Sequence, residues 1–513
     1  AVAFAGGGFR ALAADVGLVT GLLAARQAAN ATAPPTLEAA DLLRRFDTVS
    51  SSSGSTWFVS ALAYSERFQA LLERMAASPT AAGAEFQSGW MADWIAFGKK
   101  ASSENQANPF GAVLRLSGGS FLAERLREVA FFWGGGHSWT DFVGALLETT
   151  SGVDRQRRLG DAVPQWLKGK AWLVCHNVAA GTGSKPVSAS AGIEALRYSL
   201  AGSAALDGLA PLYLPAKYSV VFGSGGAEDA PFPYLSSEVA PSAAIEYVGS
   251  GLFGLFQLRD SSPPVTSLAR AAGRQPGALS VVDVAAASSA FLGGISVSQS
   301  ISTWMGLLNF QVTPWAALAD GGRRMFSSGE AIDRDLEGGI SEQVVGAAAA
   351  SGFVGVVDDL YTGGSGVAQA VGVGADEVTM VVTDLESLYG LFQNEPAAEV
   401  EFDGLPVLRA PIFAEKLDES MFKDVRYLAI PDHVRYLTRF MTATVRGTTV
   451  KSEFFGIAPG RTVTLRIVYI KTILEPGGVD NYEDYSVLVQ DIVDAMLSDA
   501  NRQAVQDGLT AYF

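Results

Sequence analysis

The chain opens with Ala1-Val2-Ala3-Phe4-Ala5-Gly6-Gly7-Gly8-Phe9-Arg10-Ala11, and this stretch decides the fold that the sequence predicts. Residues 1–5 are small and apolar, which is typical of a short buried strand, and residues 9–25 form an apolar run of helical length. The glycines between them allow a tight turn and leave N–H groups at a helix N-terminus. Such a bend binds a phosphate or the oxyanion of an acyl-transfer reaction, although a plain structural turn is equally compatible with it. Arg10 favours an anion-binding site. A cation in the first helical turn opposes the helix dipole and is unfavourable there unless an anion or a carboxylate lies beside it.

A second bend is predicted in residues 46–57 (FDTVSSSSGSTW). Residues 46–50 have the composition of a short strand, and the residues after Gly54 are helical in pattern as far as Met75. Small residues between a strand and a helix are typical of a nucleophile elbow, although a serine-rich loop that caps the helix has a similar composition. One strand–helix–strand crossover separates the two bends. Neighbouring parallel strands would therefore place both bends at the carboxyl edge of one sheet, where ligands of α/β proteins bind.

The rest of the chain continues the alternation of strands and helices. Further strands are predicted at residues 171–175, 218–222, 353–357, 378–382 and 462–470, and a helix is predicted at 485–498. This pattern indicates an α/β fold with a mostly parallel sheet and helices on both faces. Clusters of Gly, Pro and Ser predict insertions at about residues 79–169 and 192–280. Residues 284–319 carry no Asp, Glu, Lys or Arg and are predicted to be a lid or interfacial segment, with buried core as the alternative.

Composition limits the class of function. With 48% apolar and 18% charged residues among 513, the chain is not of the disordered class. A formal net charge of −16 repels phosphate backbones, so we expect no nucleic-acid partner. A single cysteine forms no internal disulfide and no cysteine-based zinc site, and three histidines leave few metal ligands. We expect neither a metal nor a cofactor. No signal peptide is recognisable, and the compartment is left open.

The two bends together resemble the patatin-like and cytosolic phospholipase A family of serine lipid acyl hydrolases. Residues 6–11 (GGGFRA) are similar to its glycine-rich oxyanion loop, and residues 53–57 (SGSTW) are similar to its nucleophile motif. The resemblance implies one patatin-like catalytic domain over residues 1–513. It also implies a Ser–Asp dyad that cleaves fatty-acyl esters of phospholipids or other lipids, with peripheral membrane contact.

Carried over residue by residue, the motifs make Ser53 the nucleophile, Gly7 and Gly8 the oxyanion donors and Arg10 the phosphate contact. The sequence has Ser51 where the family has glycine. That change leaves Ser52 as a rival nucleophile, because Ser52 and Gly54 match the Ser-x-Gly half of the general nucleophile elbow.

Three aspartates are candidates for the dyad that the resemblance implies. Asp358 ends the predicted strand 353–357 and precedes a glycine turn into a helix, but Asp359 stands where the family has glycine. Asp359 is therefore a second candidate. Asp320 is a third, because Gly321 and Gly322 follow it, although Arg323 and Arg324 indicate a surface turn. The position at the end of a strand favours Asp358. An ordinary aspartate is a weak base, so the site has to shield or tune it.

Two other interpretations stay open. A Ser–His–Asp esterase would use Ser53, Asp358 and His433. A catalytically inactive scaffold, or a subunit of a larger assembly, would explain the altered position at Ser51 and the missing glycines after Asp358. The other histidines are assigned structural roles, His176 as a core residue and His137 in a glycine turn.

Overall fold

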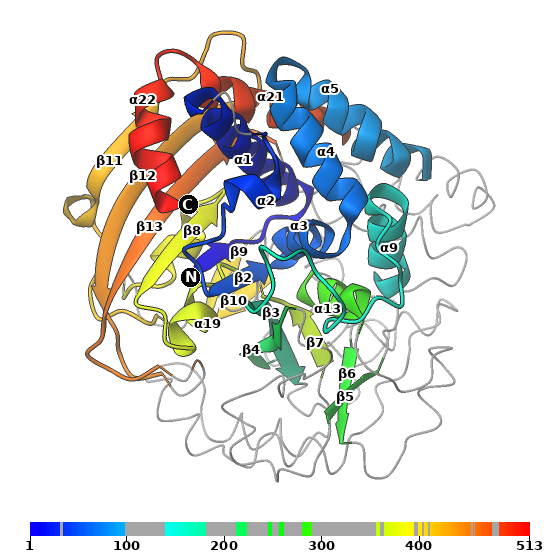
Figure 1. Ribbon diagram of the computed structural model, residues 1–513. Coiled ribbons are helices and arrows are strands. Elements are labelled where there is room, and N and C mark those ends of the chain that lie inside the picture. The colour runs from blue at the N-terminus through cyan, green and yellow to red at the C-terminus, as the bar shows by residue number, and fades with distance from the viewer. Residues whose placement is uncertain are drawn as a thin grey trace, which may run out of the picture.

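The computed structural model describes most of the chain (Figure 1). The described residues are 1–30, 34–97, 139–180, 212–222, 245–248, 256–260, 280–289, 355–359, 364–393, 399–402, 405–408, 411–452, 455, 457–474 and 482–513. Asp320 and His137 lie outside them, as does the predicted lid or interfacial segment beyond residue 289.

Eleven strands form one sheet in the described part of the chain, and two more form a hairpin. The sheet has the order β11-β12-β13-β8-β1-β2-β3-β7-β6-β5, and β4 also pairs with β3. The strands of the sheet are β1 (Val2–Phe4), β2 (Thr48–Ser52), β3 (Ala171–Ala180), β4 (Leu212–Val221), β5 (Ile245–Val248), β6 (Phe256–Asp260), β7 (Gly355–Asp358), β8 (Glu377–Val382), β11 (Lys423–Leu428), β12 (Leu437–Thr448) and β13 (Thr462–Thr472). The hairpin consists of β9 (Glu399–Phe402) and β10 (Leu405–Leu408).

The centre of the sheet is parallel. β13, β8, β1, β2 and β3 run in the same direction, which confirms the mixed α/β fold and its parallel core. The flanks are antiparallel, with β11 and β12 on one side and β4, β5, β6 and β7 on the other. Because β1 and β2 are neighbours in register, the bends that follow them lie at the same edge, as the crossover length predicts.

The helices pack on this sheet and on one another. The longer ones are α1 (Gly8–Ala29), α3 (Ser53–Tyr64), α4 (Glu66–Ala77), α9 (Trp139–Leu146), α13 (Val281–Ser288) and α21 (Tyr482–Leu497). The shorter helices are α2 (Leu37–Ala40), α5 (Ala82–Phe86), α19 (Val367–Gly372), α20 (Glu386–Tyr389), α22 (Arg502–Ala504) and α23 (Thr510–Tyr512). Helical turns of 3₁₀ or π type occupy η1 (Pro79–Ala81), η2 (Gln87–Met91), η3 (Leu147–Ser151), η5 (Glu419–Met421) and η6 (Val505–Leu509).

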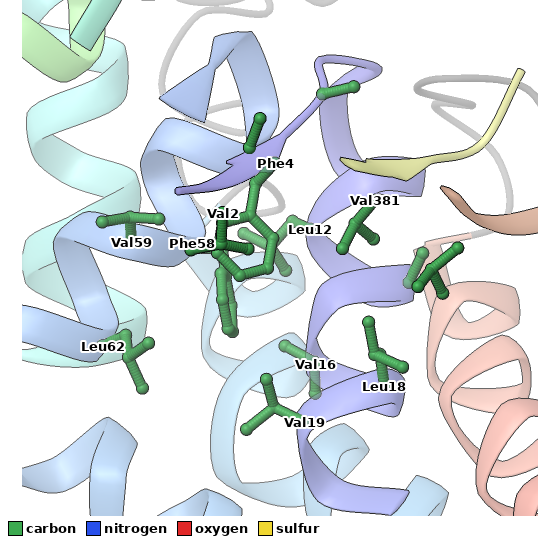
Figure 2. Packing of buried hydrophobic residues seen from close by; sticks show 14 of the residues in the cluster. Val2, Phe4, Leu12, Val16, Leu18, Val19, Phe58, Val59, Leu62 and Val381 are labelled. Atoms are coloured by element: carbon green, nitrogen blue, oxygen red, sulfur yellow. The ribbon is translucent and has the colours of Figure 1, made fainter. Parts of the chain in front are cut away.

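Helix α1 is the centre of the core. It is apolar on all sides and contacts α3, α4 and α21, which Figure 1 shows gathered around it. Phe4 of β1 packs against Phe58 of α3, with ring centroids 5.6 Å apart, and Leu12 lies beside them (Figure 2). By length and composition α1 could cross a membrane, but 89% of its most apolar window is buried inside the fold. Burial on this scale identifies it as a core helix.

The described parts of the predicted insertions contribute to the same fold. From residues 79–169, α5 packs on α21 and α9 packs on α13. From residues 192–280, the structure describes β4, β5, β6, Phe222 and Ser280. Residues 284–289, the only described part of the predicted lid or interfacial segment, belong to α13 and the turn after it, and they are buried as the alternative of a core segment predicts.

Candidate active site

Ser53 stands at the sharp bend between β2 and α3. Its φ is +50°, in the left-handed region that residues other than glycine seldom adopt. Gly54 follows, and a Cβ there would lie 2.0 Å from the carbonyl oxygen of Gly8. Only glycine permits this approach. The bend that holds Ser53 is therefore pressed against the glycine bend before α1.

The hydroxyl of Ser53 donates a hydrogen bond of 2.8 Å to Asp358 Oδ2. Residues from opposite parts of the chain meet here because β2 and β7 share one edge of β3. β2 pairs with β3 as far as Cys175, opposite Ser52, and β7 pairs with the same strand from His176, opposite Asp358. β4 pairs with all of β3 and so takes its other edge. The ends of β2 and β7 consequently meet head to head.

Strand β7 runs antiparallel to β3, whereas simple alternation of strands and helices predicts a parallel strand there. The predicted position of Asp358 at the end of its strand is nevertheless what the structure has, since β7 ends at that residue. An antiparallel strand brings the carboxylate to Ser53 because β3 extends beyond the end of β2.

The other candidates for the dyad are placed differently. Asp359 is buried and its Oδ1 accepts a hydrogen bond of 3.1 Å from Gln369 Nε2 of α19, while Ser52 is near enough to lower its pKa. Burial, together with the charge of Asp358, raises the pKa of Asp359 to about 7. Ser52 is buried beside Gly6, whose Cβ would lie 3.3 Å from Ser52 Oγ. Of the predicted residues, the structure thus brings Ser53 and Asp358 together.

The glycine loop lies directly against Ser53. A Cβ on Gly6 would be 2.9 Å from the Cβ of Ser53, and the N–H of Gly6 donates to the carbonyl oxygen of Gly364 at 2.8 Å. Gly7 and Gly8 have φ values of +140° and +58°. No hydrogen bond within the described part of the chain takes up the N–H of either glycine. These two donors at the start of α1 have the chemistry of an oxyanion hole.

Arg10 lies next to this loop and is largely buried. Its Nη2 is 3.9 Å from Asp384 Oδ2, at the outer limit of an ion pair, and its Nε has no hydrogen bond among the described residues. The buried hydroxyl of Thr383 also lacks a partner there. A Cβ on Gly7 would lie 3.2 Å from that hydroxyl and 3.5 Å from Arg10 Nη2. The Arg10 guanidinium and the Thr383 hydroxyl beside the loop therefore have hydrogen-bond donors that the described residues do not use.

The turn that carries Ser53 is anchored by contacts that the sequence did not predict. The N–H of Ser53 donates to Ser288 Oγ at 3.0 Å, and that hydroxyl donates to the carbonyl oxygen of Cys175 at 2.6 Å. Ser288 Oγ also lies 2.9 Å from Thr56 Oγ1. The one sequence signal for this helix is the stretch 287–290 (ASSA), which is similar to the segment that precedes the catalytic aspartate in patatins. Helix α13 thus holds the turn that carries Ser53.

Ser51, the departure from the family motif, has a structural role. Its hydroxyl accepts hydrogen bonds of 3.0 Å from Thr56 Oγ1 and from Trp172 Nε1. The side chain is buried between α3 and β3 and does not contact the dyad, so it leaves the bend at Ser53 intact.

The two histidines that the structure describes, His176 and His433, are not arranged as a catalytic triad with Ser53 and Asp358. His433 Nε2 lies 2.9 Å from Asp494 Oδ2, in an exposed pair, while Ser53 donates directly to Asp358. His176 is the cross-strand neighbour of Asp358 and is buried, with Nδ1 3.1 Å from the carbonyl oxygen of Val174. Burial lowers its pKa to about 4, so the imidazole is neutral at pH 7. Within the described ranges, no cluster of three or more His, Cys, Asp or Glu is placed to bind a metal.

No protein-family model, no curated protein and no solved structure was found to match the chain. The chemistry of the site therefore has to be judged from its own geometry.

Proposed function

We propose that the protein is a serine acyl hydrolase that cleaves fatty-acyl esters of phospholipids or related lipids. The observation that carries the proposal is the 2.8 Å hydrogen bond from Ser53 to Asp358, made by a serine held at positive φ on a strand–helix bend. Backbone strain of this kind concentrates at functional sites. A serine that only capped a helix would need neither the strain nor a carboxylate partner.

In the proposed mechanism Asp358 accepts the proton of Ser53 as Oγ attacks the ester carbonyl. The N–H groups of Gly7 and Gly8 stabilise the oxyanion that forms on the carbonyl oxygen. The proton then passes to the leaving alkoxide, which departs and leaves an acyl group on Ser53. Water, activated by the same carboxylate, releases the fatty acid and restores the serine.

The fold proposed for this site is patatin-like, with helices on both faces of the sheet. Successive residues of β2 support it, because neighbouring side chains in a strand point to opposite faces. Ser50 Oγ donates to the carbonyl oxygen of Gly366, at the start of α19, at 2.8 Å. Ser51 contacts Thr56 of α3 instead. Arg10, with Thr383 beside it, is the proposed contact for a lipid phosphate.

Covalent labelling tests the nucleophile. An activated serine attacks the phosphorus of a fluorophosphonate probe through its Oγ and displaces fluoride, so wild-type protein and the Ser52→Ala variant are both expected to be labelled. Ser53→Ala should abolish labelling and lower the hydrolysis of phospholipid vesicles and of a short-chain ester by at least about a thousandfold. Ser52 is the matched control because it lies in the same turn and is buried beside the same glycine.

The opposite result has a defined meaning. A folded wild-type protein that is neither labelled nor active on either ester contradicts the hydrolase and favours the inactive scaffold or assembly subunit. Labelling that persists in Ser53→Ala and disappears in Ser52→Ala would instead move the nucleophile by one residue.

A further inference from the structure

A buried acid, Asp15 on α1, contacts the helix that carries the nucleophile. The hydroxyl oxygen of Ser55, on α3, lies 2.5 Å from Asp15 Oδ2 and 2.7 Å from the carbonyl oxygen of Ala5. All three residues are at most 4% exposed. Ala5 is the last residue before the glycine loop, and Ser55 comes two residues after Ser53. The contact therefore links the residue before the glycine loop to the helix that follows Ser53.

Counting hydrogens places a proton on the acid. Each short contact between oxygens needs one hydrogen, and a serine hydroxyl supplies only one. A carbonyl oxygen supplies none, so the second hydrogen has to come from Asp15. The acid then donates to Ser55, and Ser55 donates to Ala5. If Asp15 were ionised, Ser55 would turn its hydrogen to the carboxylate, and two lone pairs would face each other at 2.7 Å.

The surroundings of Asp15 agree with a neutral acid. Within the part of the chain that the structure describes, no Lys, Arg or His forms an ion pair with it. Its helix is apolar and packed on all sides. Burial raises the pKa of Asp15 well above its usual value, which agrees with the proton that the two oxygen contacts require.

The peptide group between Ala5 and Gly6 is held from two directions. In a trans peptide the C=O and the following N–H point to opposite sides. The C=O of Ala5 is held by Ser55, and the N–H of Gly6 is held by the carbonyl oxygen of Gly364. The N–H of Gly364 in turn donates to the carbonyl oxygen of Asp359, next to the dyad aspartate. The orientation of this peptide fixes where the following glycines point.

We propose that Asp15 acts as a carboxylic acid that positions the glycine loop, by donating a hydrogen bond to Ser55 and so fixing the carbonyl of Ala5. Asp15 touches no reacting atom and is a positioning residue. The role in catalysis rests on the proposed hydrolase function, whereas the proton and the hold on the loop do not.

Three variants test the proposal. Asp15→Asn keeps the shape and an N–H donor for Ser55, Asp15→Leu keeps the branched heavy-atom skeleton without a donor although it is larger, and Ser55→Ala removes the hydroxyl with little change in volume. We expect Asn to retain kcat within about threefold, while Leu and Ala lower kcat about tenfold or more with little change in KM, because small misplacements of catalytic groups lower rates steeply. A merely structural residue would not give rescue by Asn together with a loss confined to kcat.

Two measurements need no activity. The infrared difference spectrum of wild type minus Asp15→Asn at pH 7 should contain the carbonyl band of a protonated carboxylic acid. Hydrogen exchange of the peptide covering residues 1–12 should be about tenfold faster in Asp15→Leu and Ser55→Ala and unchanged in Asp15→Asn, because the loop opens more often when the hold is lost.

The proposal is overturned by a carboxylate band in place of the acid band, by loop exchange that none of the variants alters, or by a folded Asp15→Asn protein that behaves like Asp15→Leu. A wild type that lacks esterase activity and probe labelling defeats the proposed function and with it the catalytic role of Asp15. In that case the infrared and exchange results still decide whether the acid holds the loop. Should Asp15→Leu fail to fold, Ser55→Ala gives the same comparison with a smaller disturbance.

Discussion

Gly54 is the residue at which the two bends of the site touch. Gly54→Ala would place its Cβ 2.0 Å from the carbonyl oxygen and 2.5 Å from the carbonyl carbon of Gly8, and neither is a flexible group that can move aside. We expect the variant to lose about 3 kcal/mol or more of unfolding free energy, at the upper end of overpacking effects. Probe labelling at Ser53 should be lost as well. Chemical denaturation and labelling measure the two effects.

Gly460→Ala is the matched control for that substitution. Gly460 has a φ of +82° but open space where the Cβ would be. It should therefore show only the cost of a left-handed alanine, about 1–2 kcal/mol, with labelling unchanged. Equal effects of the two substitutions would mean that the bends are not pressed together as the structure has them.

Local sequence was enough to predict the residues that meet at the candidate site. Ser53, Gly7 and Gly8 lie in two short motifs whose spacing places them at one sheet edge, and Asp358 was favoured because a strand ends there. Local sequence was not enough to exclude Asp359, its neighbour. Asp358 accepts from Ser53, 305 positions away, whereas Asp359 accepts from Gln369, 10 positions away, and is also influenced by Ser52. The contact that singles out Asp358 is therefore a long-range one, which local sequence does not reveal.

At the scale of elements, the sequence predicted part of the sheet closely but missed both β11 and β12, although β12 is mostly buried. β1, β8 and β13 match their predicted ranges within two residues, whereas β11 was missed because five of its six residues are exposed and give no apolar pattern. The helix predicted to continue as far as Met75 is divided at Ser65, whose hydroxyl accepts from the N–H of Phe68 and begins α4. The direction of β7 depends on pairing with β3 and has no local signature.

Helix α13 illustrates the same limit, because its contact with the nucleophile turn joins residues 235 positions apart. Ser288→Ala would leave the N–H of Ser53 without its acceptor. We expect a loss of about 1–3 kcal/mol of unfolding free energy, the usual effect of an unsatisfied buried donor, and a kcat lowered by about tenfold as the turn loosens.

Ser289→Ala is the comparison for this prediction. Its hydroxyl accepts from Trp57 Nε1 at 2.9 Å, so it joins the same two helices without contacting Ser53. The variant should lose a similar amount of stability and keep its kcat. A fall in kcat that is equal in both variants would assign the effect to the packing of α13 and contradict a specific role for Ser288.

At the scale of the whole molecule, three buried groups set opposing dependences of stability on pH. The pKa values of Asp15 and Asp359 are raised in the folded protein, so each contributes stability that is complete below the usual pKa of 3.8 and is lost as the pH rises toward the folded value. The pKa of His176 is lowered from 6.5 to about 4, so its contribution is present above pH 6.5 and is lost as the pH falls. Between these limits the acids and the histidine partly cancel.

Replacing both acids should reveal the pH dependence of stability that His176 contributes. In Asp15→Asn/Asp359→Asn, we expect the unfolding free energy to rise from pH 4 to about 6.5, because His176 no longer meets opposition, and then to stay level. Wild type should fall relative to this variant by up to about 1.4 kcal/mol per pH unit for each acid, through about pH 7 for Asp359 and as far as the raised folded pKa for Asp15. Denaturant midpoints measured from pH 4 to 9 give both curves. Parallel curves would show that neither acid is buried in its neutral form, because a constant difference requires equal proton binding in the folded and unfolded states.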